Sequence, residues 1–233
     1  MKLLHKTLLS LGTILFATQL QAAPITLIGS DFDVVYDDGL LGLFGAPIIS
    51  GNTVFFTPVQ FKAESLNGIG FDTKNSTVNF QLLAHSGISF SSLDLIEHGD
   101  YKMRGADSFV NVGGQTRVFD LLNPSNLDTS TIAATGALTI KDGLTHNWTS
   151  TSSISLSTPQ WQNIRSVNYT IENLLEAYTD SSNVGPKLAF IEKKFAGSAI
   201  SLVVTPVPEP ASYAMMIAGL VLIGALKRKA KTS

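Results

Sequence analysis

The sequence predicts an all-β protein: one exported β-sandwich of jelly-roll-like type, placed between two terminal targeting segments. Short alternations of apolar and polar residues, separated by turn residues, recur through residues 23–206. The chain also begins and ends with an apolar run beside basic residues. It contains no cysteine, so the exported domain is expected to depend on its hydrophobic core for stability, without disulfides.

The N-terminus predicts a secretory signal peptide over residues 1–22. Two lysines precede an apolar stretch from about Leu8 to Leu20, and small residues follow. Cleavage is expected after Ala22, because a cut after Ala23 would leave Pro24 next to the scissile bond. The partners implied are the Sec translocon and signal peptidase. The alternative is an uncleaved anchor, for which the apolar stretch is short.

The charge of the central region differs from that of the whole chain. Residues 23–206 hold ten Lys and Arg against seventeen Asp and Glu, a net of −7, whereas the whole chain carries −2. A domain this acidic repels phosphate backbones, which excludes nucleic acid as an expected partner.

Period-two alternation predicts the strands. Examples are the residues 32–36, which end at a turn signal, and the residues 78–82. The alternation over residues 88–95 changes phase, which predicts a β-bulge near Ser91 and Ser92. The segment 167–178 fits a strand to about Ile171, and its later residues also fit a helical face, so a turn of helix is the alternative there.

Strand phase also predicts which side chains fill the core. The expected core residues are large apolar or aromatic residues at inward positions of the alternations: Phe55, Phe80, Leu82, Phe90, Leu93, Leu95, Phe109, Val118, Val167, Tyr169 and Phe190.

The C-terminal segment 207–233 has three parts in a fixed order. A Pro-Glu-Pro motif comes first, and proline holds such a tripeptide extended. The uncharged run 211–226 follows, and as a helix it would span about 24 Å, short of a bilayer core of about 30 Å. A basic tail over 227–233 closes the chain and is expected to stay cytoplasmic. The residues singled out are Val207, Pro208, Glu209 and Pro210 in the motif, and Lys227, Arg228, Lys229 and Lys231 in the tail.

This ordered combination resembles the PEP-CTERM sorting domain of Gram-negative bacteria. The resemblance implies that a membrane enzyme, exosortase, recognises the motif, removes the helix and passes the protein from the inner membrane towards the cell surface. It also implies an association with extracellular polysaccharide and biofilm matrix. The apolar run would then be a single, temporary transmembrane helix.

Few residues point to chemistry in the central region. There is no Gly-x-Ser-x-Gly elbow or His-Glu-x-x-His spacing, so no catalytic residue, cofactor or firm metal site is predicted. The segment 96–101, with Glu97, His98 and Asp100, is interpreted as a solvated strand end in which Gly99 makes the turn. Carboxylates prefer hard cations such as Ca²⁺, which makes one acidic cluster a weak calcium candidate: Asp31, Asp33, Asp37 and Asp38.

Exposed aromatic rings can stack on sugars, and Trp148 and Trp161 are the candidate ligand contacts, with core packing as the alternative role. The predicted function is therefore a non-enzymatic surface or matrix protein. One alternative is a carbohydrate-binding or polysaccharide-active protein on the same β-sandwich. Another is a periplasmic-side protein that stays anchored by its C-terminus.

Overall fold

A computed structural model describes residues 23–181, 185–194, 198–209, 213, 215–221 and 223 of the 233-residue chain. The predicted signal peptide, with Ala22 at its cleavage site, lies outside the described residues. So do Pro210 and the basic tail from Lys227 onwards.

The prediction of an all-β fold is confirmed. The described residues form thirteen strands, joined by turns and by two short 3-10 helices, η1 (Asp38–Leu40) and η2 (Pro159–Trp161). The strands are β1 (Ile25–Ile28), β2 (Phe32–Tyr36), β3 (Ile48–Ser50), β4 (Thr53–Phe56), β5 (Lys62–Leu66), β6 (Gly70–Ala84), β7 (Ile88–Arg104), β8 (Phe109–Asp120), β9 (Leu127–Ala134), β10 (His146–Ser155), β11 (Ser166–Thr179), β12 (Leu188–Lys193) and β13 (Ile200–Pro208).

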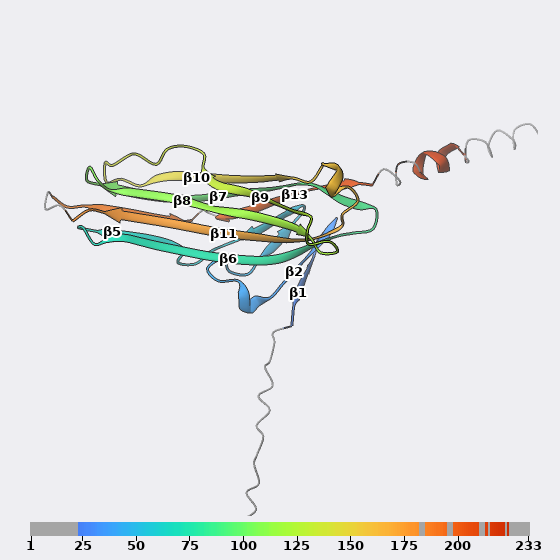
Figure 1. The fold of residues 1–233 in the computed structure, drawn as a ribbon, viewed down its shortest axis with the longest axis horizontal. Helices are drawn as coiled ribbons and strands as arrows, with labels where there is room; N and C mark the ends of the chain where they lie inside the picture. Colours follow the sequence, from blue (N-terminus) through green and yellow to red (C-terminus); the bar gives the residue numbers. More distant parts are fainter. Residues whose placement is uncertain are drawn as a thin grey trace, which may run out of the picture.

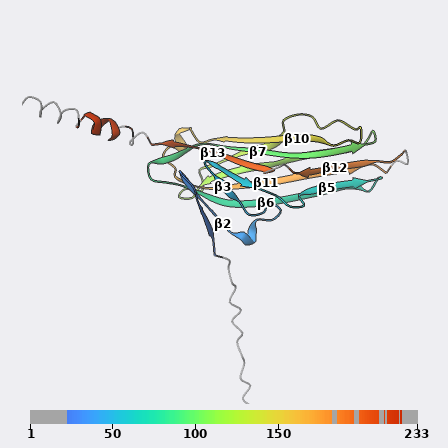
Figure 2. The same cartoon turned by 180° about the vertical axis from the view of Figure 1, so that it is seen from behind.

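The prediction was a jelly-roll-like β-sandwich, and all thirteen strands of the described residues belong to one antiparallel sheet that curls round on itself. The strand order is β1-β2-β6-β11-β8-β9-β10-β7-β13-β4-β3, and β12 pairs with both β7 and β5. The junction between β9 and β10 is narrow, because only Ala133 and Ala134 have partners across it. Figures 1 and 2 show the long strands running lengthwise, with β6 and β11 facing β7 and β10 across the core.

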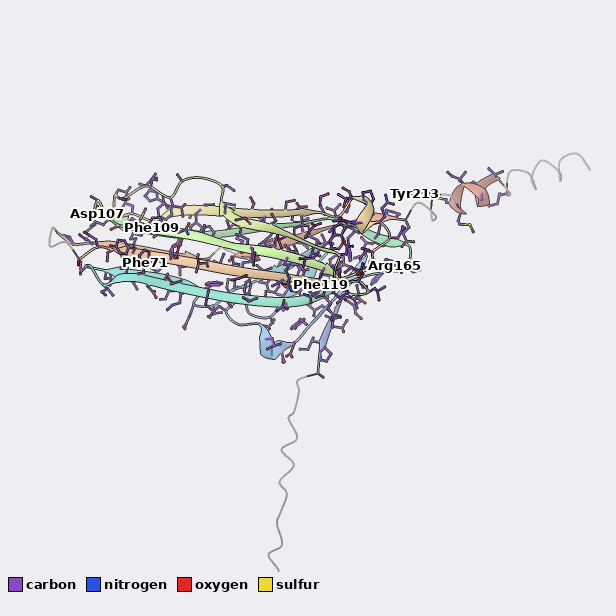
Figure 3. The ribbon with its side chains drawn as sticks, in the orientation of Figure 1. Phe71, Asp107, Phe109, Phe119, Arg165 and Tyr213 are labelled. Atoms are coloured by element: carbon purple, nitrogen blue, oxygen red, sulfur yellow. The ribbon has the colours of Figure 1, made fainter. Side chains whose placement is uncertain are left out.

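Most of the predicted core is confirmed. Phe80, Leu82, Phe90, Leu93, Leu95, Val118, Val167 and Tyr169 are all buried. Three predictions are wrong: Phe55 and Phe190 are only half-buried, and Phe109 is 45% exposed and lies on the outer face (Figure 3). In each case the neighbouring residues point inwards instead, namely Val54, Phe56, Ala189, Ile191 and Val110. A shift of one residue in strand phase exchanges the two faces, and runs that are apolar on both faces hide that phase.

Two other expectations meet opposite outcomes. The β-bulge is confirmed, because the register between β7 and β13 shifts after Thr205 and skips Ser91. The turn of helix considered after Ile171 is wrong, because β11 continues as a strand to Thr179. It pairs with β6 along one side and β8 along the other, and those backbone hydrogen bonds outweigh the helical spacing of its apolar residues.

The interpretation of residues 96–101 as a solvated strand end is also wrong. Strand β7 runs through this segment to Arg104, and Glu97 and Gly99 face the core. Glu97 is fully buried. A glutamate is predicted to be exposed because a buried charge needs a partner. Here the partner is Lys193 on β12, a strand that is distant in sequence but adjacent to β7 in the sheet.

The C-terminal strand crosses the predicted domain boundary at residue 206, because β13 continues to Pro208. Residues 213, 215–221 and 223 are helical and lie beyond the end of the sheet (Figure 1). Among the residues that the structure describes, no helix is long and apolar enough to cross a membrane. Part of the predicted transmembrane segment 211–226 lies outside those residues.

Candidate functional site

The motif residues continue β13 along the edge of β7. After the register shift, Pro206 pairs with Phe90, Val207 with Ser89 and Pro208 with Ile88. The amide of Glu209 then donates a hydrogen bond of 2.9 Å to the carbonyl of Gly87. The first three motif residues are therefore extended, as predicted, and they are held against the domain by backbone pairing.

One side of this last stretch of β13 is open. Strand β4 pairs with β13 only as far as Val203, so residues 206–208 form an edge. Two of these residues are proline and lack an amide hydrogen, which weakens the pairing and also prevents another strand from adding to this edge. The arrangement yields a short, weakly held, extended segment at one end of the domain.

The Glu209 side chain meets a basic residue, Arg165, which immediately precedes β11. Its Oε1 lies 3.6 Å from Nε of Arg165, and the side chains are 22% and 42% exposed respectively. The backbone of Arg165 is held in place because its carbonyl accepts a 2.7 Å hydrogen bond from the Ala84 amide. Arg165 lies at the end of the domain where β13 leaves the sheet (Figure 3). This exposed ion pair is weak and readily broken.

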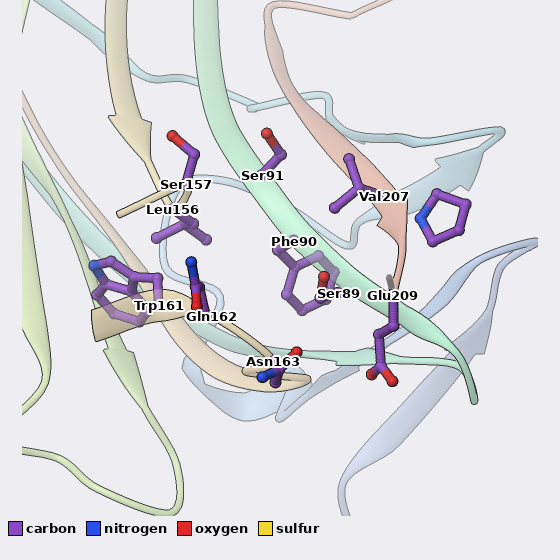
Figure 4. A pocket seen from close by; sticks show the side chains of 11 residues that line it. Ser89, Phe90, Ser91, Leu156, Ser157, Trp161, Gln162, Asn163, Val207 and Glu209 are labelled. Carbon is purple, nitrogen blue, oxygen red and sulfur yellow. The ribbon is translucent and has the colours of Figure 1, made fainter. Parts of the chain in front are cut away.

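A pocket of about 480 Å³ adjoins the motif (Figure 4). Its lining is more apolar than polar, and serine hydroxyls and the side-chain amides of Gln162 and Asn163 lie among the apolar side chains. Its walls come from the start of β7, the residues after β10, η2 and the end of β13: Ser89, Phe90, Ser91, Leu156, Ser157, Trp161, Gln162, Asn163, Val207, Pro208 and Glu209. Because the motif itself forms one wall, any event that removes the end of β13 opens this pocket.

The opposite end of the domain carries a row of aromatic side chains that strand patterning did not indicate as a surface. Phe71, Tyr178 and Phe109 are register partners on the adjacent strands β6, β11 and β8. The rings of Phe71 and Tyr178 lie 4.5 Å apart, and Phe71 is 64% exposed. Figure 3 shows Phe71 and Phe109 far from Arg165. We call these three residues the aromatic row. The sequence alone does not indicate the aromatic row, because only the pairing of the three strands brings these residues together.

Both tryptophans are buried. Trp148 Nε1 donates to the carbonyl of Asp100 at 3.2 Å, and Trp161 Nε1 donates to Oδ2 of Asp128 at 2.6 Å. With 4% and 1% exposure, the rings pack in the core and present no open face for a sugar. The expected aromatic platform is thus absent at these two positions, and Trp161 only borders the pocket beside the motif.

The acidic cluster near the N-terminus is divided among separate local contacts. Asp33 Oδ1 lies 2.9 Å from Nε2 of His85, and that hydrogen bond raises the pKa of His85 above its ordinary value. Asp37 accepts the amide of Gly39 at 2.9 Å and so caps η1. In the described part of the chain, no group of three or more His, Cys, Asp or Glu side chains is placed to hold a metal ion.

Comparison with known proteins identifies the C-terminus. Residues 206–229 match the family described as the PEP-CTERM protein-sorting motif, and the chain therefore carries that motif. Such a motif is recognised by exosortase and marks a protein for export and targeting to the cell surface.

The remainder of the chain has no informative relative. No curated protein matches it. Among solved structures, it is similar to chains from "Structure of infectious bursal disease virus Gt strain" (13% identity, TM-score 0.23, 81% of this chain and 48% of that chain) and "Crystal structure of infectious bursal disease virus VP2 subviral particle" (15% identity, TM-score 0.20, 88% and 55%). The chain spans about half the length of those viral chains, and scores this low assign no function.

Proposed function

We propose that this chain is a non-enzymatic surface or extracellular-matrix protein that exosortase releases from a temporary C-terminal anchor in the inner membrane. The observation that carries the proposal is the PEP-CTERM motif, which continues directly from the last strand of an acidic all-β domain. The apolar segment 211–226 is the temporary transmembrane helix, and the basic tail keeps its end in the cytoplasm.

In this proposal the domain presents the motif in a conformation that a protease can bind. Proteolytic clefts bind extended segments, and the end of β13 is extended and paired on one edge only. Glu209 is the polar group that the enzyme would recognise between two rigid prolines. Release from Arg165 and from Gly87 would precede recognition, and both contacts are weak enough to allow it.

The test is the intact mass of the mature protein in a host with exosortase and in the same host without it. We expect the competent host to yield a chain that has lost the segment after the motif, and the deficient host to yield a chain that ends at Ser233. Glu209→Ala should leave export unchanged and retain the protein in the inner membrane. A mature chain ending at Ser233 in the competent host would leave only the plain C-terminal anchor.

A second candidate function is polysaccharide binding, favoured by the aromatic row. Two exposed rings, Phe71 and Phe109, flank the half-buried Tyr178 on neighbouring strands, and sugar rings can stack on such aromatic side chains. The row lies at the end of the domain away from the anchor, so a tethered protein would still expose it (Figure 3). The aromatic row would then be the surface through which the protein binds extracellular polysaccharide.

This second candidate is tested with a glycan array and matched variants. Binding to one glycan class should be lost in Phe71→Ala and Tyr178→Ala. Phe119→Ala, on β8 at the other end of the domain, should bind normally. No binding by the wild-type protein would remove the polysaccharide function, and turnover of any glycan would overturn the non-enzymatic assignment.

A further inference from the structure

The centre of the core contains three polar side chains that neither proposed function uses. Glu97 lies on β7, Lys193 on β12 and Asn173 on β11. The side chains of Glu97 and Lys193 are 0% exposed, and Asn173 is 0% exposed as well. β12 and β7 are paired neighbours, whereas β11 lies in the facing part of the curled sheet, so the cluster joins the two layers.

The three side chains meet at one carboxylate. Lys193 Nζ donates to Glu97 Oε2 at 2.6 Å, and Asn173 Nδ2 donates to Glu97 Oε1 at 2.6 Å. Ser150 Oγ donates to Oε2 at 2.8 Å and holds the carboxylate from the side of β10. The Asn173 carbonyl oxygen, however, has no hydrogen-bond partner, although it is buried.

The backbone makes room for this arrangement. Register pairs Lys193 with Gly99, two residues beyond Glu97 on the same face of β7. A Cβ at Gly99 would lie 2.0 Å from the carbonyl oxygen of Glu192 and 2.4 Å from the ring of Trp148. Only glycine therefore allows β12 and Trp148 to approach β7 this closely, which seats the lysine amine against Glu97.

Stability does not account for the cluster. Removing two charges from water costs several kcal/mol per ion, and apolar residues of the same volume commonly stabilise a core at least as well as a buried pair. The unpartnered Asn173 carbonyl adds a further cost of about 1–3 kcal/mol. Because the unreacted cluster is unfavourable for stability, we attribute its presence to a reaction between its own side chains.

The surroundings of Lys193 favour an uncharged, nucleophilic amine. Its Nζ lies 5.1 Å from the ring centroid of Trp148 and 5.5 Å from that of Phe61, and these rings exclude water. Burial lowers the pKa of Lys193 below its ordinary value, an effect that the nearby Glu97 carboxylate partly opposes. Transfer of the ammonium proton to Glu97 leaves a neutral amine beside a carboxamide, which is the pair of groups needed for amide exchange.

We propose that Lys193 and Asn173 join in an intramolecular isopeptide bond, with Glu97 as the group that carries the proton. A half-turn of the Asn173 amide exchanges its oxygen and nitrogen, so the carbonyl oxygen then faces the protonated Glu97 carboxyl. The hydrogen bond that results satisfies this oxygen and polarises the carbonyl carbon for attack.

The step balances without any co-reactant. The Lys193 amine attacks Cγ of Asn173, a C–N bond forms, and the Cγ–Nδ2 bond breaks. Glu97, which already holds the proton from the Lys193 ammonium, gives that proton to the departing nitrogen, which leaves as ammonia, and the resulting carboxylate then takes one from the attacking nitrogen. The product is a secondary amide between the two side chains, and no atom changes oxidation state. A chain without cysteine would thus gain a covalent tie between its two layers.

The test is peptide mapping of the mature protein after denaturation and trypsin digestion. A bonded chain should give the peptide 166–187 joined through its side chain to the peptide 188–194, because trypsin does not cut after an acylated lysine. The joined pair should weigh about 17 Da less than the two free peptides, the mass of one ammonia molecule. Fragmentation should show two N-termini, Ser166 and Leu188, which separates the joined pair from a missed cleavage.

Variants identify the roles. Lys193→Met and Asn173→Ala should abolish the joined peptide, and Glu97→Gln should abolish or greatly slow its formation while preserving the shape of the side chain. Lys187→Met is the matched control, because Lys187 is a second buried lysine, paired with Asp180, and its loss should leave the bond intact. Trypsin no longer cuts after residue 187 in this variant, so the intact bond should appear as one peptide 166–194 that is about 17 Da lighter than its sequence mass, with no cut after Lys193. Free peptides 166–187 and 188–193 from folded wild-type protein would overturn the proposal, even if every variant failed to fold.

Discussion

Glu97 and Glu209 each pair with one basic residue, and the two pairs differ in almost every physical respect. Glu97 meets Lys193 at 2.6 Å with both side chains at 0% exposure. Glu209 meets Arg165 at 3.6 Å, and both side chains remain partly in water. Glu97 lies in the middle of a 17-residue strand, whereas Glu209 follows the last residue of β13, where that strand is paired on one side only.

The difference shows how burial assigns a role to a carboxylate. In the core, the Coulomb attraction is strong and the cost of an unpaired charge is high, so Glu97 is held in one geometry. At the surface, water screens the pair, and Glu209 can exchange Arg165 for another partner at small cost. The buried pair is suited to a permanent or covalent contact. The exposed pair is suited to an exchange in which Glu209 leaves Arg165 and binds a group on another protein.

The largest expected effect comes from removing each glutamate in turn. Glu97→Ala should lower the free energy of unfolding by about 3–5 kcal/mol, because it leaves the buried Lys193 and Asn173 without their common partner. Glu209→Ala should change the free energy of unfolding by less than about 1 kcal/mol. Urea unfolding followed by the fluorescence of Trp148 and Trp161, both buried, measures this. Equal effects of the two variants would remove the contrast between core and surface.

The next largest effect is expected from filling the space beside the buried pair. Gly99→Ala should destabilise the protein by about 1–3 kcal/mol, because the added methyl group overlaps the Glu192 carbonyl and the Trp148 ring. Gly113→Ala, in strand β8, is the matched control, since the nearest atom to its Cβ lies 3.9 Å away. The control should be neutral within about 0.5 kcal/mol. A tolerated alanine at 99 would show that β12 need not approach β7 so closely.

The exposed pair is tested by a substitution that should change the rate of C-terminal processing more than the stability of the domain. Arg165→Ala should alter the free energy of unfolding by less than about 1 kcal/mol while speeding removal of the C-terminal segment, because it frees Glu209 for exosortase. Pulse-chase analysis in an exosortase-competent host follows this rate. Arg117→Ala is the control, since Arg117 stacks on Phe119 and does not pair with Glu209. Slower processing in Arg165→Ala would mean that the pair helps to present the motif.

The smallest effect concerns pH near the motif, where the His85 carbonyl accepts the amide of Ile88. The Asp33 carboxylate raises the folded-state pKa of His85 above 6.5. The pair therefore adds stability below pH 6.5, and this contribution is lost as pH rises through the raised pKa. An NMR titration of His85 should give a pKa above 6.5 in the wild type and a lower one in Asp33→Asn. An unchanged pKa in the variant would assign the shift to Asp31 or to the Ser30 carbonyl instead.

Local patterns predicted several parts of this molecule because their signals do not depend on distant residues. The Pro-Glu-Pro motif, the all-β class and the β-bulge at Ser91 all follow from short stretches of sequence. The phase of strands that are apolar on both faces did not follow, and Phe55 and Phe190 were misplaced for that reason. The aromatic row required the pairing of three strands, which the sequence does not state.

The sequence by itself determined the properties that depend on composition or on neighbouring residues: strand content, the absence of disulfides, the charge of the domain and a C-terminal sorting motif. Tertiary structure decided which distant residues meet. It placed the last strand across the expected boundary at residue 206, so that the motif is docked on the domain. It also turned Glu97 from an expected surface charge into the centre of a buried cluster with Lys193 and Asn173. The physical reason is that the cost of burying a charge depends on its partners, and those partners lie 76 and 96 residues further along the chain.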